Sequence, residues 1–159
     1  MLALKLGLSL NTTKPYGEWT PAGDANLVAW YANKRGITLN GSDVSTWADS
    51  SANSHDMVQA TATEQPAYNA STGALSFVTA DVNNLQTSSQ ISLTGVFTIG
   101  IKLNPDAVNV SVLADNTTSG EFIKIQTSSR MRIKIDNTQV DIDLNSGTFG
   151  DDYLVITRN

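Results

Sequence analysis

The chain has 159 residues, of which 40% are hydrophobic and only 16% are charged, and its formal net charge is −5. This length fits one domain with a sizeable core. An acidic surface repels phosphate backbones, so nucleic acid is not expected as a partner. The lack of cysteine excludes disulfides and cysteine-based zinc sites, and no segment approaches the ~20 apolar residues of a membrane helix.

The first ten residues, MLALKLGLSL, place leucine at every second position. This is the period of a β-strand, whereas a signal peptide has a continuous apolar run. Residues 11–24 contain two prolines and two glycines among polar residues, which is typical of a linker. We therefore expect an N-terminal strand-and-linker arm over residues 1–24 and a separate domain over residues 25–159.

The second body begins at NLVAWYA, residues 26–32. From there on, short runs rich in Val, Ile, Thr and Phe alternate with turn residues, which predicts an all-β, antiparallel sandwich or barrel. The expected strands cover residues 44–47, 57–60, 74–79, 96–103, 110–114, 122–126, 131–135, 140–144 and 153–157.

Residues 130–145, RMRIKIDNTQVDIDLN, are interpreted as a hairpin that turns at Asn137–Thr138. This register has one apolar face and one face of opposite charges, as a half-buried antiparallel ribbon requires. The expected charged pairs are Lys134 with Asp141 and Arg132 with Asp143. The expected apolar pairs are Ile135 with Val140, Ile133 with Ile142, and Met131 with Leu144.

The only histidine lies in VSTWADSSANSHDMVQA, residues 44–60. This stretch resembles a signature of the concanavalin A-like superfamily, specifically of the laminin G-like jelly rolls. The positions that match in order are Asp49, Ser50, Ser51, Asn53, His55 and Asp56. Ala52 and Ser54 stand where that family usually has glycine, which implies a different loop backbone.

Further segments resemble the same family. Residues 26–47 look like its opening strand and the loop that follows. Residues 64–87 look like its proline-containing edge followed by a strand, with Pro66, Phe77, Asp81 and Leu85 at the matching positions. The resemblance covers about residue 26 to the end and implies an antiparallel β-sandwich of the concanavalin A-like jelly-roll type.

The N-terminal segment followed by such a domain resembles tailed-phage virion proteins, marine cyanophage proteins among them. This implies a non-enzymatic structural protein on the particle exterior, first of all a capsid decoration or accessory protein. Its partners would be other virion proteins and further copies of the chain. One alternative is a tail-fibre or adhesin module that binds host-surface carbohydrate, and another is a degenerate glycan hydrolase.

The loop residues allow two interpretations. As a turn, Asp49 and the serines accept hydrogen bonds from nearby backbone N–H groups, and no metal or other cofactor is needed. As a calcium site, which some members of the superfamily have, the ligand oxygens would come from Asp49, Asn53, Asp56 and Asp81. The spacing is not that of a complete calcium motif, so the turn is favoured.

Catalysis is not expected. The β-glucanases of this superfamily place two glutamates and an aspartate at alternating positions on one strand. Here Asp141 and Asp143 share a face, but the flanking glutamates are missing and the neighbouring strand is basic. That neighbour keeps both carboxylates ionised, whereas a general acid needs a raised pKa. His55 is the sole histidine and no Gly-x-Ser-x-Gly motif is present, so a serine triad is not expected either.

Two groups of residues remain as candidate binding elements. The aromatic residues of the linker, Tyr16 and Trp19, are candidates for glycan contact, whereas Trp30 and Trp47 lie in apolar runs that favour the core. The leucines of the first strand are candidates for β-augmentation, in which the strand joins a sheet edge of a neighbouring subunit or another virion protein. The alternative is that the strand folds back onto its own domain and completes its core. These assembly residues are Leu2, Leu4, Leu6, Leu8 and Leu10.

Overall fold

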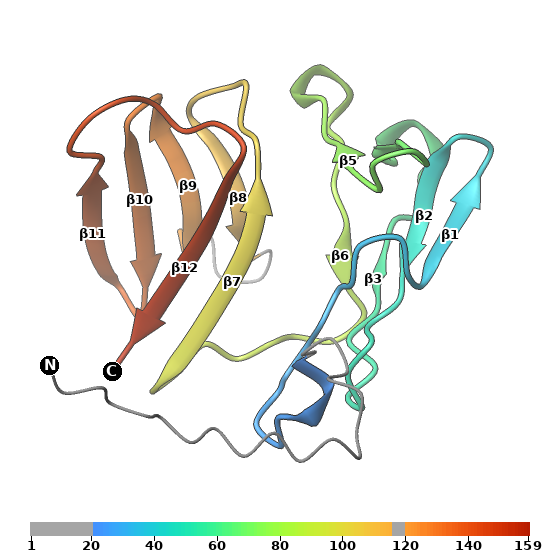
Figure 1. Ribbon diagram of the computed structural model, residues 1–159, viewed down its shortest axis with the longest axis horizontal. Coiled ribbons are helices and arrows are strands. Elements are labelled where there is room, and N and C mark those ends of the chain that lie inside the picture. Colours follow the sequence, from blue (N-terminus) through green and yellow to red (C-terminus); the bar gives the residue numbers. More distant parts are fainter. Residues whose placement is uncertain (1–20, 116–119) are drawn as a thin grey trace, which may run out of the picture. The chain divides into compact units, whose positions relative to one another are not determined.

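The computed structural model describes residues 21–115 and 120–159. The described chain is all-β, every strand pairing in it is antiparallel, and the sheets are compatible with the expected β-sandwich (Figure 1). The chain divides into two compact units, unit 1 (Met1–Ser89) and unit 2 (Gln90–Asn159). The predicted arm over residues 1–24 lies almost entirely outside the described residues, so that boundary stays a prediction.

Unit 1 contains a six-stranded sheet in which β2 (Asp43–Trp47) pairs with three other strands. The other strands are β1 (Ile37–Asn40), β3 (Met57–Val58), β4 (Ala67–Tyr68), β5 (Leu75–Ser76) and β6 (Gln86–Thr87). Three single 3₁₀ turns accompany them, namely η1 (Pro21–Gly23), η2 (Ala62–Glu64) and η3 (Thr79–Asp81). The sequence predicted β2, β3 and β5 but missed β1, β4 and β6, most of which are only two residues long.

The buried centre of unit 1 is small and partly polar. Val44 is completely buried, and its backbone N–H donates to the carbonyl of Pro66, which is also buried. The neighbouring Gln65 is 6% exposed, and its side-chain amide makes two hydrogen bonds. Its amide nitrogen donates to the Gln59 carbonyl at 2.7 Å, and its amide oxygen accepts from Asn40 at 3.1 Å. A buried amide that is paired in this way connects separate segments without an unsatisfied polar group.

Unit 2 consists of two antiparallel sheets (Figure 1). A four-stranded sheet has the order β11-β10-β9-β8, and a two-stranded sheet is formed by β12 and β7. The strands are β7 (Phe97–Leu103), β8 (Val110–Ala114), β9 (Phe122–Thr127), β10 (Arg130–Ile135), β11 (Thr138–Asp143) and β12 (Asp152–Arg158). All six were predicted, with bounds that differ by no more than two residues.

The two sheets of unit 2 enclose one apolar cluster. Its centre is formed by Ile123 and Ile125 of β9 and Met131 of β10, each 1% exposed. Half-buried side chains from the two-stranded sheet pack against this centre, among them Ile99 of β7 and Ile156 of β12. The alternation of exposed and covered residues along β7 and β12 is the pattern of strands with one face on a core.

The β10–β11 hairpin forms, but its predicted register is wrong by two residues. Ile133 pairs with Val140 and Arg132 pairs with Asp141, so the turn is Asp136–Asn137. Both turn residues have positive φ, 50° and 60°, as a two-residue type I′ turn requires. Asp and Asn tolerate this conformation, whereas a β-branched threonine in the turn disfavours it. A shift of two residues preserves the two faces, so the apolar and charged sides of the ribbon are as predicted.

The resemblance places an opening strand and the loop after it in residues 26–47, but the apolar residues 26–32 at the start of this range form no strand. Polar side chains of a later loop take the place of a strand partner. The Asn53 amide donates to the carbonyls of Leu27 and Val28, at 2.8 and 2.9 Å, and Asp49 accepts from the Trp30 N–H. The backbone of this segment is therefore held by side chains of the later loop and not by a neighbouring strand.

Candidate functional site

The loop of residues 49–56, here called the Asp49 loop, follows β2 and is organised around one carboxylate. Oδ1 of Asp49 accepts from the backbone N–H groups of Trp30 and Ser51, both at 2.8 Å. Oδ2 accepts from the Ser51 hydroxyl at 2.6 Å and from the His55 N–H at 3.0 Å. Four donors are close to the full accepting capacity of a carboxylate. Asp49 therefore fixes both its own turn and the segment that precedes β1.

A second carboxylate closes the Asp49 loop. Asp56 accepts from the backbone N–H of Asp49 at 2.8 Å, and Ser54 between them has φ of 58°. Ser54 stands at one of the positions where the laminin G-like pattern has glycine. The chain therefore adopts left-handed geometry at this position without a glycine, at some conformational cost.

The hydrogen bonds have a clear electrostatic effect. Burial raises the pKa of the Asp49 carboxyl, but the hydrogen bonds from Ser51, Trp30 and His55 lower it more, and the resulting pKa is about 2. Burial, together with the negative charges of Asp49 and Asp56, raises the pKa of the Tyr31 hydroxyl to about 12. The Tyr31 hydroxyl donates to the His55 carbonyl. At neutral pH the loop thus contains a fixed carboxylate beside a neutral phenol.

His55 contacts Ser89, a residue that the sequence did not single out. Its Nδ1 lies 2.7 Å from the Ser89 hydroxyl. Such a distance fits a base and a nucleophile, but a nucleophilic serine also needs the histidine to be oriented by a third group. Within the described residues, no hydrogen bond is formed to the other ring nitrogen. The neighbouring Ser88 N–H donates to the Asp56 carbonyl at 2.7 Å, so the contact serves to join the end of β6 to the Asp49 loop.

Three of the four residues of the calcium interpretation, Asp49, Asn53 and Asp56, make hydrogen bonds within the protein. All four acceptor positions of Asp49 face donors, and Asn53 uses its amide nitrogen to hold two backbone carbonyls. Asp81 lies in η3. In residues 21–115 and 120–159, no three His, Cys, Asp or Glu side chains are grouped so that they could hold a metal ion.

The paired carboxylates of β11 are bound by arginines. Arg132 contacts both oxygens of Asp141, at 2.7 and 2.8 Å, and Arg130 contacts both oxygens of Asp143, at 2.6 and 2.9 Å. The hydrogen bond and positive charge of each arginine hold the pKa of its partner carboxyl below the ordinary value. A glycosidase acid requires the opposite shift. This arrangement is suited to an exposed, charge-paired sheet face and not to acid catalysis.

The aromatic candidates fall into two groups. Tyr16 and Trp19 lie outside the described residues. Trp47 is half-buried, donates from Nε1 to the Ala32 carbonyl at 3.1 Å and lies 5.7 Å from the Tyr31 ring. Tyr153 on β12, by contrast, is 78% exposed, and the Lys102 amine lies 5.1 Å from its ring centre.

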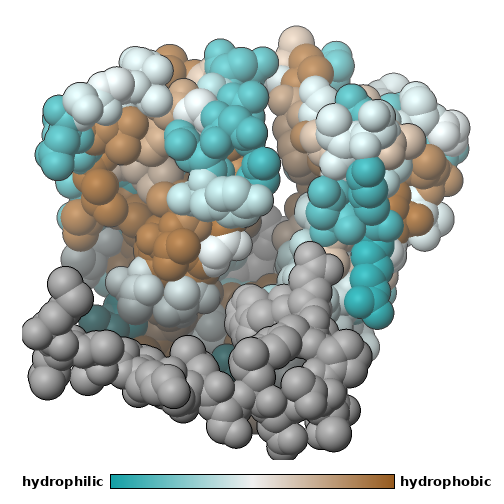
Figure 2. All heavy atoms as spheres, in the orientation of Figure 1, coloured by the Kyte–Doolittle hydropathy of each residue, from teal (hydrophilic) through white to brown (hydrophobic). Residues whose placement is uncertain are grey.

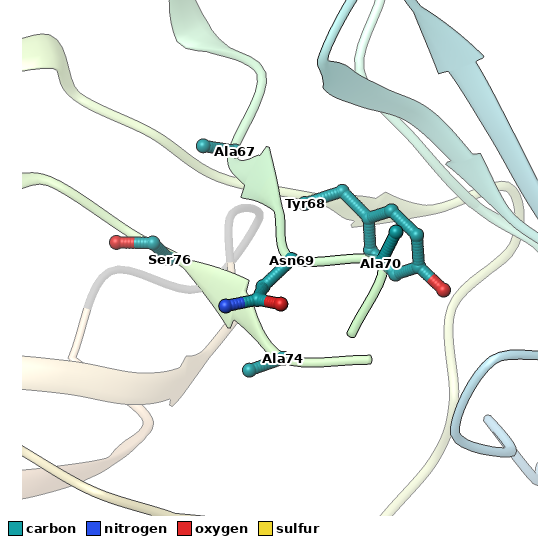
Figure 3. A pocket seen from close by; sticks show the side chains of 6 residues that line it. All are labelled: Ala67, Tyr68, Asn69, Ala70, Ala74 and Ser76. Atoms are coloured by element: carbon teal, nitrogen blue, oxygen red, sulfur yellow. The ribbon is translucent and has the colours of Figure 1, made fainter. Parts of the chain in front are cut away.

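One hollow of the surface is lined mainly by small, uncharged side chains. It has a volume of about 470 Å³ and lies on β4, β5 and the turn between them, and its residues are Ala67, Tyr68, Asn69, Ala70, Ala74 and Ser76 (Figure 3). It has no charged group, and the amide oxygen of Asn69 already accepts from two backbone N–H groups of its own turn. Its lining contains no carboxylate, amine or imidazole, and Tyr68 is its one titratable side chain.

Comparisons with models of protein families, with curated proteins and with solved structures find no match for this chain. The resemblance to laminin G-like jelly rolls therefore remains a resemblance in sequence. In the part of the chain that the structure describes, no helix is long and apolar enough to cross a membrane. The five leucines of the predicted assembly strand lie outside the described residues.

One surface was not anticipated from the sequence. Val140 and Ile142 of β11 are 51% and 46% exposed, although they lie on the apolar face of the hairpin. Figure 2 shows apolar side chains gathered on the visible face of unit 2, over β11 and β12. The alternation of these residues was visible in the sequence, but the position of β11 at the end of its sheet was not.

Proposed function

We propose that this chain is a non-enzymatic structural protein on the exterior of a tailed-phage particle, where it serves as a capsid decoration or accessory surface protein. Its partners are other virion proteins and further copies of itself. The sequence resemblance supports the location, and the antiparallel β architecture is compatible with it. Fold alone does not specify function, so the residues of the site have to support the rest.

The observation that supports a non-enzymatic role is the pairing of Asp141 and Asp143 with arginines. These are the two carboxylates that come nearest to the glycosidase arrangement, and both have a lowered pKa. The exposed apolar residues at the edge of β11 support a role in assembly, because exposed apolar patches mark interaction surfaces.

The test is to locate the chain on the particle. Purified virions are analysed by mass spectrometry and by particle reconstruction, with a tag fused to the C-terminus as a marker. We expect the chain in purified particles, at regular exterior positions. A chain that is found only in infected-cell lysate, and never with particles, would contradict the proposal.

Binding of host-surface glycan is a second candidate, and the exposure of Tyr153 favours it. Val155, two residues further along β12, is 68% exposed. It pairs with Gly100, and a Cβ atom added to this glycine would have no other heavy atom within 4 Å. Tyr153 thus stands beside open space with the Lys102 amine over its ring, and an exposed aromatic side chain of this kind can stack on a sugar. A glycan array would test this, with Tyr153→Ala expected to lose binding. Phe77→Ala, which changes another exposed aromatic residue, is the matched control.

A further inference from the structure

The edge strand β11 differs from the other sheet edges of unit 2. Its inward-facing residues Val140 and Ile142 are exposed, whereas their cross-strand partners Ile133 and Met131 belong to the core cluster. On the other edge strands, β7, β8 and β12, the inward-facing apolar residues are at least half-buried. Among the described strands of unit 2, only β11 carries core-facing apolar residues that no other described strand of the unit covers.

The backbone of β11 is also open to a further strand. In a two-residue hairpin the pair that flanks the turn, here Ile135 and Thr138, exchanges hydrogen bonds, and every second pair does the same. The Leu144 N–H, which donates to the Ser129 carbonyl at 2.8 Å, has the parity that this pattern requires. The N–H and C=O groups of the intervening residues therefore point away from β10. These residues are Gln139, Asp141 and Asp143.

The charges of the exposed face alternate from strand to strand. β10 contributes Arg130 and Arg132, and β11 contributes Asp141 and Asp143. A strand added next to β11 would be favoured if it carried a basic residue on this face, because opposite charges on neighbouring strands attract. The added strand would also need apolar residues at alternate positions to cover Val140 and Ile142.

The chain's own N-terminal sequence meets both conditions. In residues 2–10, leucines alternate with Ala3, Lys5, Gly7 and Ser9. If the leucines cover Val140 and Ile142, Lys5 comes to lie on the acidic side. Pairing of β11 with β11 of another copy would instead bring carboxylates face to face, which is unfavourable.

We propose that residues 2–10 of one copy add to β11 of a second copy as an antiparallel strand. Lys5 then pairs with Asp141, Leu4 with Ile142 and Leu6 with Val140. This inference rests on the proposed assembly role, because a strand bound within its own chain would not join copies. It specifies which edge accepts the arm and which residues set the register.

Disulfide trapping tests the pairing, and the native chain has no cysteine to interfere. One chain carries Leu6→Cys, and a second chain with a size tag carries Val140→Cys. Directly opposite residues of paired strands lie within the Cα separation that a disulfide spans. We expect a mixed disulfide between the two chains after mild oxidation. Gln139→Cys is the matched control, because its side chain points to the other face, and we expect little cross-linking with it.

The outcomes separate this inference from the proposed function. If no mixed disulfide forms, or if the Gln139→Cys control cross-links equally well, the proposed edge or register is wrong, even for a chain found on particles. If only a double variant closes a bond within a single chain, the second-copy assignment is wrong. If the mixed disulfide forms but the chain is absent from virions, the strand exchange stands and the virion assignment fails.

A charge at the acceptor edge gives an independent test. Val140→Lys places a positive charge on β11, and charged side chains on an edge strand prevent the addition of a further strand. We expect the variant to elute as a folded monomer, because Val140 is already half-exposed and its replacement leaves the core in place. Val155→Lys on β12 is the matched control and should assemble like the unaltered chain. An oligomer that persists in Val140→Lys would overturn the proposal.

Discussion

The two units of this chain are stabilised in different ways. Unit 2 has strands of five to seven residues and an apolar cluster around Ile123 and Met131. In residues 21–89 of unit 1 no strand is longer than five residues, and polar side chains bind the backbone of distant segments. Asp49 joins segments 19 residues apart, and Asn83 donates to the carbonyl of Gln65, 18 residues away.

The two units should respond differently to substitutions and to acid. Apolar burial is spread over many contacts and depends little on pH. In unit 1, by contrast, the Asp49 carboxylate accepts four hydrogen bonds, so much of the stabilisation of the loop depends on one ionisable group. Loss of that carboxylate leaves several donors unsatisfied. Unit 1 should therefore be sensitive to single polar substitutions and to acid, and unit 2 to charges placed in its core.

The largest effect is expected from a charge in the core of unit 2. Ile123→Asp places an unpaired carboxylate at a position that is 1% exposed, which is strongly unfavourable. We expect this variant to lose the structure of unit 2, measured by loss of dispersed amide signals from residues 90–159. Val155→Asp, at a residue 68% exposed, should remain folded. A folded Ile123→Asp variant would show that the cluster is not the core.

A smaller but clear effect is expected at Asp49. Asp49→Asn keeps the shape but replaces one acceptor oxygen by a donor, which then faces an N–H or O–H. We expect a loss of about 1–3 kcal/mol in the free energy of unfolding of unit 1, measured by urea denaturation. Asp81→Asn is the matched control and should have little effect, because the Asp81 carboxylate makes no hydrogen bond within the described residues. Equal effects of the two substitutions would show that Asp49 has no special role.

The pH dependence of unit 1 should follow the same carboxylate. The pKa of Asp49 is about 2 in the folded chain, below its ordinary value of 3.8. A lowered folded pKa means that the stabilisation is complete above about pH 4 and is lost as the pH falls through about 2. We expect a loss of roughly 1–2 kcal/mol over this range. In Asp49→Asn this decrease should be smaller, and an identical pH profile for both proteins would refute the assignment.

Two conditions should have almost no effect. Replacing Arg132 and Asp141 together by threonine removes an exposed ion pair, and such pairs contribute little to stability. The denaturation midpoint of unit 2 should therefore change only slightly. Unfolding caused by this double substitution would mean that the charged face is buried against another surface.

Removal of divalent metal is expected to have no effect either. Treatment with EDTA should leave the melting temperature unchanged, since the Asp49 loop is held by donors of the protein itself. A ligand that binds only the folded state raises stability by mass action. A large decrease that calcium reverses would therefore favour the metal interpretation of Asp49, Asn53, Asp56 and Asp81.

The same contrast explains what the sequence could predict. In unit 2 the alternation of apolar and polar residues identified all six strands, because long strands with one covered face have a period of two. In unit 1 several backbone groups outside the short strands bind side chains of Asp, Asn and Ser, and these residues give no periodic signal. The apolar run at residues 26–32 was interpreted as strand, although side chains of the Asp49 loop bind its backbone. The short strand β1 was missed.

The candidate site was predicted in part. The loop around Asp49 was identified as a turn from its residue types, and the structure shows which donors its carboxylate accepts. The contact between His55 and Ser89 joins residues 34 positions apart, and no local pattern predicts it. The hairpin register failed because the turn was placed at Thr138. The positive φ preference of Asp136 and Asn137 could have corrected it.

Amide hydrogen exchange in β11 tests the central claim most directly, namely that this edge accepts an N-terminal strand. The full chain is compared with a variant that lacks residues 1–20, both at a concentration where the full chain assembles. We predict that the backbone amides of Gln139, Asp141 and Asp143, which point away from β10, are protected in the full chain and exchange rapidly in the truncated one. The backbone amides of Val140 and Ile142, which point toward β10, should be protected in both proteins. Equally rapid exchange of the amides of Gln139, Asp141 and Asp143 in both proteins would contradict the claim.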